Sequence, residues 1–192
     1  MNAVTAMAEN TGYDVARWRA DFPILSERVY DKPLVFLDSA ASAQKPQGVI
    51  DAMRYCYEHE YANIHRGVYW LSQKSTQAYE DTRVKVQRFI NAASEKEIIF
   101  TKGTTEAINL VASSYGGSAL QAGDEIILSH LEHHANIVPW QLLRQRIGIE
   151  IKVAPIDDQG NFLLEEFEKL LSPRTRLVAI THGSNALGTI PP

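Results

Sequence analysis

The fold class follows from one stretch of the sequence, Glu125-Ile126-Ile127-Leu128-Ser129-His130-Leu131-Glu132-His133-His134-Ala135-Asn136. It begins with a short apolar run and continues directly into polar side chains. The same pattern occurs at residues 97–106, which end in Thr101-Lys102-Gly103-Thr104-Thr105-Glu106, and at 177–185, which end in Thr181-His182-Gly183-Ser184-Asn185. In α/β sheets, ligands bind outside the carboxyl ends of parallel strands. Three polar strand ends therefore predict one site for a cofactor or a substrate.

Strands and helices alternate around these three segments. The apolar runs predict strands at 97–101, 125–129, 149–154 and 176–181, and the helical spacing of apolar residues predicts helices at 104–115, 136–147 and 163–171. Alternation at this spacing favours right-handed crossovers and a mostly parallel sheet. The amino-terminal part is less regular, with helices expected at 15–22, 46–60 and 75–91 and a short strand at 34–37.

Composition excludes several classes of protein. The chain has 192 residues, of which 45% are hydrophobic and 22% charged, as in an ordinary globular protein. The net charge of −4 gives no electrostatic case for nucleic acid or an anionic membrane. Neither a signal peptide nor a membrane-spanning stretch is visible, so we expect a cytoplasmic protein. The single cysteine, Cys56, excludes an internal disulfide and is expected to be a buried, inert thiol on a helix face.

Gly103-Thr104-Thr105 lies between a strand and a helix. Free N–H groups and the positive end of the helix dipole at such a turn can hold a phosphate. The alternative is a helix capped by threonine hydroxyls with no ligand.

Histidine and asparagine side chains follow the other two strands. Glu132-His133-His134 lacks the spacing of the known zinc motifs, so a metal site is not expected. His133 can instead stack on an aromatic cofactor and move protons, or serve only as a hydrogen-bonding loop residue. Asn185 can bind a ligand oxygen or form an Asx-turn. The pair His65-Arg66, before Gly67, suits an anion or is a solvated loop charge.

Taken together, these segments resemble the amino-terminal half of SUF-type (group II) cysteine desulfurases, which are pyridoxal-phosphate enzymes of the aminotransferase class V family. The resemblance extends from Asp21 to Gly188. The matching stretches are residues 37–46, Asn63-Ile64-His65-Arg66-Gly67, Gly103-Thr104-Thr105-Glu106, residues 132–140 and residues 181–188.

The resemblance implies a role for each matching residue. Thr104 and Thr105 are expected to bind the phosphate of pyridoxal 5'-phosphate. His133 is expected to stack on the pyridine ring and act in acid–base catalysis, and Asn185 to hydrogen-bond near the phenolic oxygen. The expected substrate-proximal residues are Ala40, Ala41, His65 and Arg66, the last two near the partner subunit's site in a homodimer.

The implied reaction takes sulfur from L-cysteine, leaving L-alanine and an enzyme persulfide. The sulfur then passes to an acceptor protein for iron–sulfur cluster assembly. The implied fold is the fold type I large domain, α/β and mostly parallel, and incomplete in this chain. Residues 1–45 are expected to form an arm contributing to the small domain and the active site, and residues 46–192 the first part of the cofactor-binding large domain.

The resemblance also implies chemistry that lies beyond Pro192. The Schiff-base lysine of the family, its persulfide cysteine and a carboxylate-binding arginine are expected in a carboxyl-terminal half, either as a second polypeptide or missing from this sequence. In this fold, strand 125–129 lies between 149–154 and 176–181, which leaves strand 97–101 without a neighbour. The alternatives are a selenocysteine lyase or another class V enzyme, a non-catalytic truncated paralogue that serves in binding or dimerisation, and, last, a nucleotide-binding protein, which lacks its glycine-rich motifs.

Overall fold

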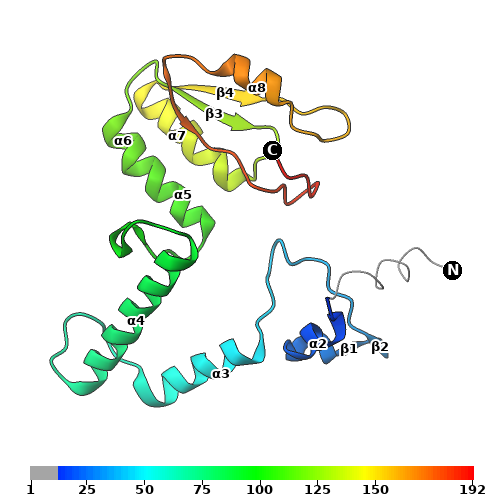
Figure 1. The fold of residues 1–192 in the computed structure, drawn as a ribbon. Coiled ribbons are helices and arrows are strands. Elements are labelled where there is room, and N and C mark those ends of the chain that lie inside the picture. The colour runs from blue at the N-terminus through cyan, green and yellow to red at the C-terminus, as the bar shows by residue number, and fades with distance from the viewer. Residues whose placement is uncertain (1–12) are drawn as a thin grey trace. The chain divides into compact units, whose positions relative to one another are not determined.

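The computed structural model describes residues 13–192, which form two compact units (Figure 1). One unit ends at Ile98 and the other begins at Ile99. The expectation that no signal peptide is present concerns the first eleven residues, which lie outside the described part of the chain.

The first unit is mainly helical. Its elements are α2 (Val15–Ala20), η1 (Pro23–Ser26), β1 (Arg28–Val29), β2 (Lys32–Pro33), α3 (Gln47–Tyr55), the π-helical turn η2 (Cys56–Glu60), α4 (Trp70–Phe89) and η3 (Glu95–Glu97).

The second unit contains a parallel three-stranded sheet in the order β4-β3-β5. Its strands are β3 (Glu125–Ser129), β4 (Glu150–Ala154) and β5 (Thr175–Val178). This order confirms that the second expected strand lies between the third and the fourth. Because all three strands run in the same direction, the loops after β3 and β5 leave from the same edge of the sheet.

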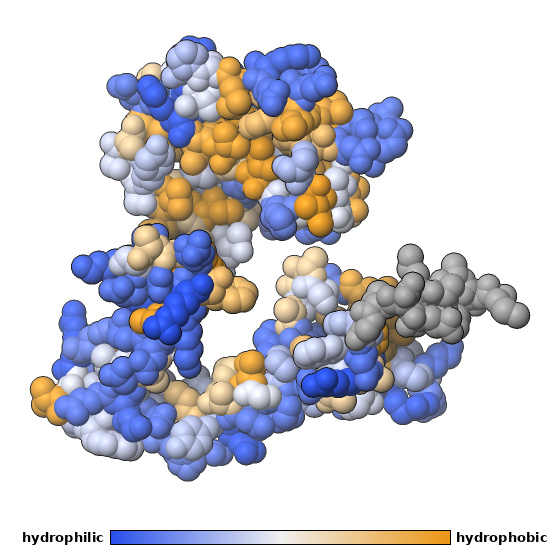
Figure 2. All heavy atoms as spheres, in the orientation of Figure 1, coloured by the Kyte–Doolittle hydropathy of each residue, from blue (hydrophilic) through white to orange (hydrophobic). Residues whose placement is uncertain are grey.

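Helices pack around the sheet of this unit. They are α5 (Thr104–Ser113), α6 (Tyr115–Ala119), η4 (His134–Asn136), α7 (Val138–Ile147) and α8 (Leu164–Leu170), the last of which contacts β4. Ile126 and Leu128 share a core with Trp140 and Leu143 of α7 and Ala112 of α5. On the face drawn in Figure 2, apolar side chains gather over this unit, whereas α4 is largely hydrophilic.

Two expected strands are absent from the described residues. The segment 97–101 contains the end of η3 and then irregular backbone. The apolar run is present, but no neighbouring strand supplies hydrogen bonds, as the sheet order anticipates. The segment 34–37 is likewise not a strand; it follows a short hairpin of β1 and β2 whose turn has positive φ at Tyr30 and Asp31.

Other expectations differ mainly at the ends of elements. The helix expected at 75–91 begins earlier, at Trp70, and the strand expected at 176–181 ends at Val178. The helix expected at 136–147 starts with the short 3-10 turn η4 before α7. The expected burial of Cys56 is wrong: the thiol is exposed at the point where α3 passes into the π-helical turn.

Candidate functional site

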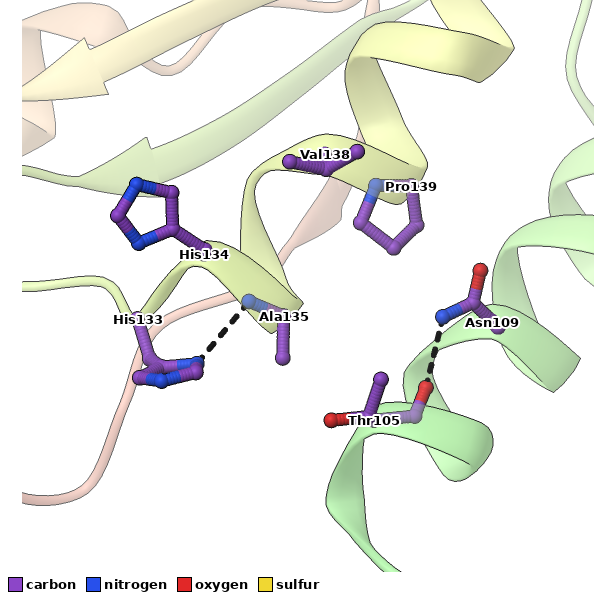
Figure 3. Close-up of a pocket in the computed structure, with 7 residues that line it drawn as sticks. All are labelled: Thr105, Asn109, His133, His134, Ala135, Val138 and Pro139. Carbon is purple, nitrogen blue, oxygen red and sulfur yellow. Dashed lines mark hydrogen bonds between the residues drawn. The ribbon is translucent and has the colours of Figure 1, made fainter.

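A shallow pocket of about 330 Å³ lies beside the start of α5 and the loop after β3. Thr105 and Asn109 of α5 line one side, and residues 133–135 face them (Figure 3). Val138 and Pro139 of α7 complete the lining. The fold therefore brings Thr105 and His133 together, although they are distant in sequence.

The turn Gly103-Thr104-Thr105, at the start of α5, has backbone N–H donors without partners among the described residues. Gly103 is the residue before the first turn of α5 and makes no side-chain cap, so the alternative of a helix capped by threonine hydroxyls is not formed. Among the described residues, no acceptor bonds the backbone N–H groups of Thr104 and Thr105, and both residues are exposed. Unpaired N–H groups, two hydroxyls and the positive end of the dipole are suited to a phosphate.

His133 is held in one orientation by a backbone group. It precedes η4, and its Nδ1 accepts a hydrogen bond from the Ala135 N–H at 3.1 Å (Figure 3). An accepting Nδ1 carries no proton, so the neutral ring has its proton on Nε2. The other side of the ring is open to the pocket and to solvent. His133 is thus a partly anchored imidazole with one nitrogen available for chemistry.

Asn185 lies in the loop after β5, on a turn built by its neighbour. Ser184 is buried, and its Oγ accepts from the N–H groups of Ala186 and Leu187 at 3.3 and 3.2 Å. Gly188 takes the positive φ that closes the turn. The Asn185 amide is exposed, is not part of the pocket lining and has no hydrogen-bond partner among the described residues. The alternative of an Asx-turn is therefore not formed.

The other four predicted site residues belong to the first unit. Ala40 and Ala41 lie in an exposed turn, in which the Ala41 N–H donates to the Asp38 carbonyl at 3.2 Å. His65 and Arg66 lie in an exposed loop before α4. His65 has a positive φ of 66°, which is uncommon for a residue other than glycine.

Two polar residues of the second unit were not anticipated as site residues. Asn109 lines the pocket one helical turn after Thr105, and its Nδ2 donates to the Thr105 carbonyl at 2.8 Å. The spacing of four residues on a helix was the signal that could have identified it. Glu132 was considered only as a metal ligand, but its carboxylate is engaged by three hydrogen-bond donors. Within residues 13–192, no three His, Cys, Asp or Glu side chains are grouped so as to hold a metal ion.

The opposite end of the sheet carries a buried charge cluster. Glu125, the first residue of β3, has no exposed surface and pairs with Lys152 at 2.7 Å and Arg174 at 2.8 Å. Hydrogen bonds from Lys152 and Ser172 lower its pKa to about 2, against an opposing effect of burial. Next to it, a hydrogen bond from the Gln121 backbone, assisted by Arg176, lowers the pKa of Asp124.

The fold and the site define an α/β protein with an open parallel sheet and a shallow pocket between the loop after β3 and the start of α5. The chain belongs to the aminotransferase class-V family, whose sequence model matches residues 35–192. It is 59% identical over 178 residues to a probable cysteine desulfurase of Mycobacterium leprae, covering 93% of this chain and 29% of the relative. It is 56% identical over 180 residues to a cysteine desulfurase of Dickeya dadantii, covering 94% of this chain and 44% of the relative.

Solved structures show the same relationship. An apo cysteine desulfurase from Thermococcus onnurineus superposes with a TM-score of 0.83 at 38% identity, covering 94% of this chain and 43% of that one. A cysteine desulfurase from Escherichia coli gives a TM-score of 0.78 at 39% identity, covering 94% and 44%. The chain therefore spans less than half the length of these relatives. No helix among the described residues has the length and apolar character needed to cross a membrane.

Proposed function

We propose that this chain forms the cofactor-binding part of a pyridoxal-phosphate-dependent cysteine desulfurase. The observation that carries the proposal is the pocket that joins the free N-terminus of α5 to the anchored ring of His133. The identity of more than half of the aligned residues with proteins named cysteine desulfurase supports it.

The chemistry of the pocket fits pyridoxal phosphate. Its phosphate dianion suits the N–H groups and hydroxyls of Thr104 and Thr105, and its flat ring suits the exposed imidazole of His133. When bound, this cofactor acts as an electron sink for the substrate. His133 orients the ring and moves a proton at Nε2, because Nδ1 is occupied by the Ala135 N–H. Asn185, whose amide has no hydrogen-bond partner among the described residues, would hydrogen-bond near the phenolic oxygen.

The first unit has a supporting role in this proposal. Ala40 and Ala41 lie beside the substrate, and His65 and Arg66 reach the partner subunit's site in a homodimer. Residues 1–45 act as an arm that contributes to the small domain and the active site, whereas 46–192 are the first part of the large domain.

The remainder of the reaction uses residues outside 1–192. A carboxyl-terminal half, as a second chain or as the rest of a longer one, supplies the lysine that holds the cofactor and the cysteine that takes sulfur from L-cysteine. L-alanine is released, and the sulfur passes to an acceptor protein for iron–sulfur cluster assembly. The matching motifs favour the SUF type, and we propose a cytoplasmic location for the protein.

The test uses the protein at its natural length, incubated with pyridoxal phosphate and then with L-cysteine and a reductant. We expect a visible absorbance band, alanine and sulfide in equal amounts, and, after borohydride reduction, cofactor attached to a lysine outside residues 1–192. Substituting Thr105→Val should weaken cofactor binding by about tenfold, because a hydrogen bond to a charged group contributes ~1.5–3 kcal/mol. Thr82→Val, on α4, is the matched control.

Different outcomes favour the alternatives. Turnover of L-selenocysteine but not L-cysteine would indicate a selenocysteine lyase. Cofactor bound without turnover of either amino acid, combined with capture of a full-length desulfurase, would indicate a non-catalytic paralogue. Absence of any cofactor band would contradict the proposal.

A further inference from the structure

The carboxylate of Glu132 is held by three donors from three segments of the chain. Oε1 accepts from the Ser129 hydroxyl at 2.5 Å and from the Thr181 N–H at 2.8 Å. Oε2 accepts from the Asn136 side-chain amide at 2.7 Å. These donors belong to the end of β3, to the segment after β5 and to η4, in that order. One side chain therefore ties together the loops that carry His133 and Asn185.

The direction of each hydrogen bond in this network is fixed. The Trp140 indole N–H, which can only donate, bonds Asn136 Oδ1 at 2.9 Å. This orients the amide so that its Nδ2 faces Glu132, and the same Nδ2 also reaches the Ala179 carbonyl at 2.9 Å. On the other side, the Thr181 backbone N–H is also only a donor. Position 132 must consequently accept on both oxygens, which a carboxylate does and an amide cannot.

The position of Glu132 in the chain gives this network a functional consequence. It directly precedes His133, whose ring lines the pocket, and its bond to Thr181 fixes the start of the loop that contains Asn185. Beyond Val178 the paired strand ends, and Ala179 makes a last ladder hydrogen bond to Ile127. Beyond Ala179, the hydrogen bond from the Thr181 N–H to Glu132 connects the loop after β5 to the loop after β3.

We propose that Glu132 is a positioning residue, whose double acceptor sets the relative placement of the His133 and Asn185 loops for cofactor binding. It acts through its neighbours and does not itself touch the cofactor. This proposal rests on the proposed function for its consequence in binding, but the tethering of Thr181 can be measured without any cofactor.

The experiment compares Glu132→Gln with Glu125→Gln in the protein at its natural length. Both substitutions remove a negative charge that links β3 to the chain around β5. Glu125, however, is at the opposite end of the strands, where it bonds Ser172 and Thr175. Two quantities are measured: hydrogen exchange of the Thr181 amide in the cofactor-free protein, and the dissociation constant for pyridoxal phosphate.

In Glu132→Gln, the new amide must face either Asn136 or the Thr181 N–H with a donor. We expect the Thr181 amide to exchange at least about tenfold faster and the cofactor to bind about tenfold more weakly, since a hydrogen bond to a charged group is lost. In Glu125→Gln, we expect a lower unfolding midpoint, with both quantities within about twofold of the unsubstituted protein.

Ser129→Ala provides a milder second variant, because it removes one donor and leaves the carboxylate with two. It should shift both quantities in the same direction by a smaller factor. Unchanged Thr181 exchange in Glu132→Gln and Ser129→Ala would overturn the proposal, as would equal effects of Glu132→Gln and Glu125→Gln. If the unsubstituted protein binds no cofactor, the proposed function fails, and the exchange data alone then decide whether Glu132 tethers the loop.

Discussion

At the residue scale, Glu125 shows how a carboxylate can remain charged without access to water. Burial alone raises the pKa of a carboxyl group, but Lys152 and Arg174 pair with this one, and Ser172 and Thr175 donate to it. The hydrogen bonds from Lys152 and Ser172, together with the charges of Lys152 and Arg174, lower its pKa to about 2 from the ordinary 4.5. The same contacts connect β3 to β4 and to the turn before β5.

This shift predicts an acid-dependent loss of stability. A carboxyl group whose pKa is lower in the folded state stabilises that state above its unfolded pKa, and the contribution is lost as pH falls toward the folded value. Stability from Glu125 should therefore be complete above about pH 4.5 and decline toward about pH 2. We expect the unsubstituted protein to have a higher free energy of unfolding in urea than Glu125→Gln at about pH 6. This difference in unfolding free energy should be smaller at about pH 3. A difference that does not change with pH would contradict the assigned contacts.

At the element scale, two hydroxyls of α4 hold the loop that carries His65 and Arg66. Ser72 is fully buried, and its Oγ accepts from the Gly67 N–H at 3.1 Å and donates to the Asn63 carbonyl at 2.7 Å. A side chain at position 67 would overlap Ser72, which explains the glycine. One turn later, Thr76 accepts from the His65 N–H at 2.9 Å. The loop is therefore preformed despite its exposure.

Thr76→Val should loosen this loop, because valine keeps the shape but removes the acceptor for the His65 N–H. A lost backbone hydrogen bond costs ~1 kcal/mol, so exchange of the His65 amide should be about fivefold faster. Thr82→Val is the matched control: both hydroxyls donate to the carbonyl four residues earlier, at 2.7 and 2.8 Å, but the Thr82 hydroxyl has no bond to the loop. Thr76→Ser should restore slow exchange. If the His65 amide exchanged equally fast in both valine variants, the cause would be a change in α4 and not the loss of the bond between Thr76 and His65.

At the scale of the whole molecule, the second unit has a core but also much uncovered apolar surface. Ile99 is 68% exposed, and Val153 and Val178 on the outer strands are 41% and 42% exposed. Among the described residues, β4 and β5 each pair on one side only. Exposed apolar patches and unpaired strand edges favour association with further protein.

We therefore predict that residues 1–192 expressed alone bind a hydrophobic dye strongly and associate, and that adding the carboxyl-terminal half of a relative as a separate chain suppresses both effects. Sizing by light scattering and dye fluorescence provide the measurements. A monomeric 192-residue chain with a cooperative unfolding transition and little dye binding would contradict the prediction.

Much of the second unit was predictable from the sequence, because its strands are marked by short apolar runs with turns or polar loops directly beside them. The run Glu125–Ser129 is bounded by a turn and a polar loop, and the strand has the predicted limits. The apolar run at 97–101 carries a similar signal but forms no strand, because strand formation requires a neighbour. Cys56 has the spacing of a buried helix face, yet it is exposed, since spacing indicates which residues share a face but not whether anything covers it.

Apolar periodicity, turn residues and motifs lie in consecutive positions, so they were enough to predict the parallel α/β class, the family, and the polar segments that follow β3 and β5. Only the tertiary structure decided that Thr105 and His133 share a pocket, that Nδ1 of His133 is occupied, and that Glu132 joins the loops after β3 and β5. Thr181 and Glu132 are 49 positions apart, and a hydrogen bond over that separation exists only after the strands have paired.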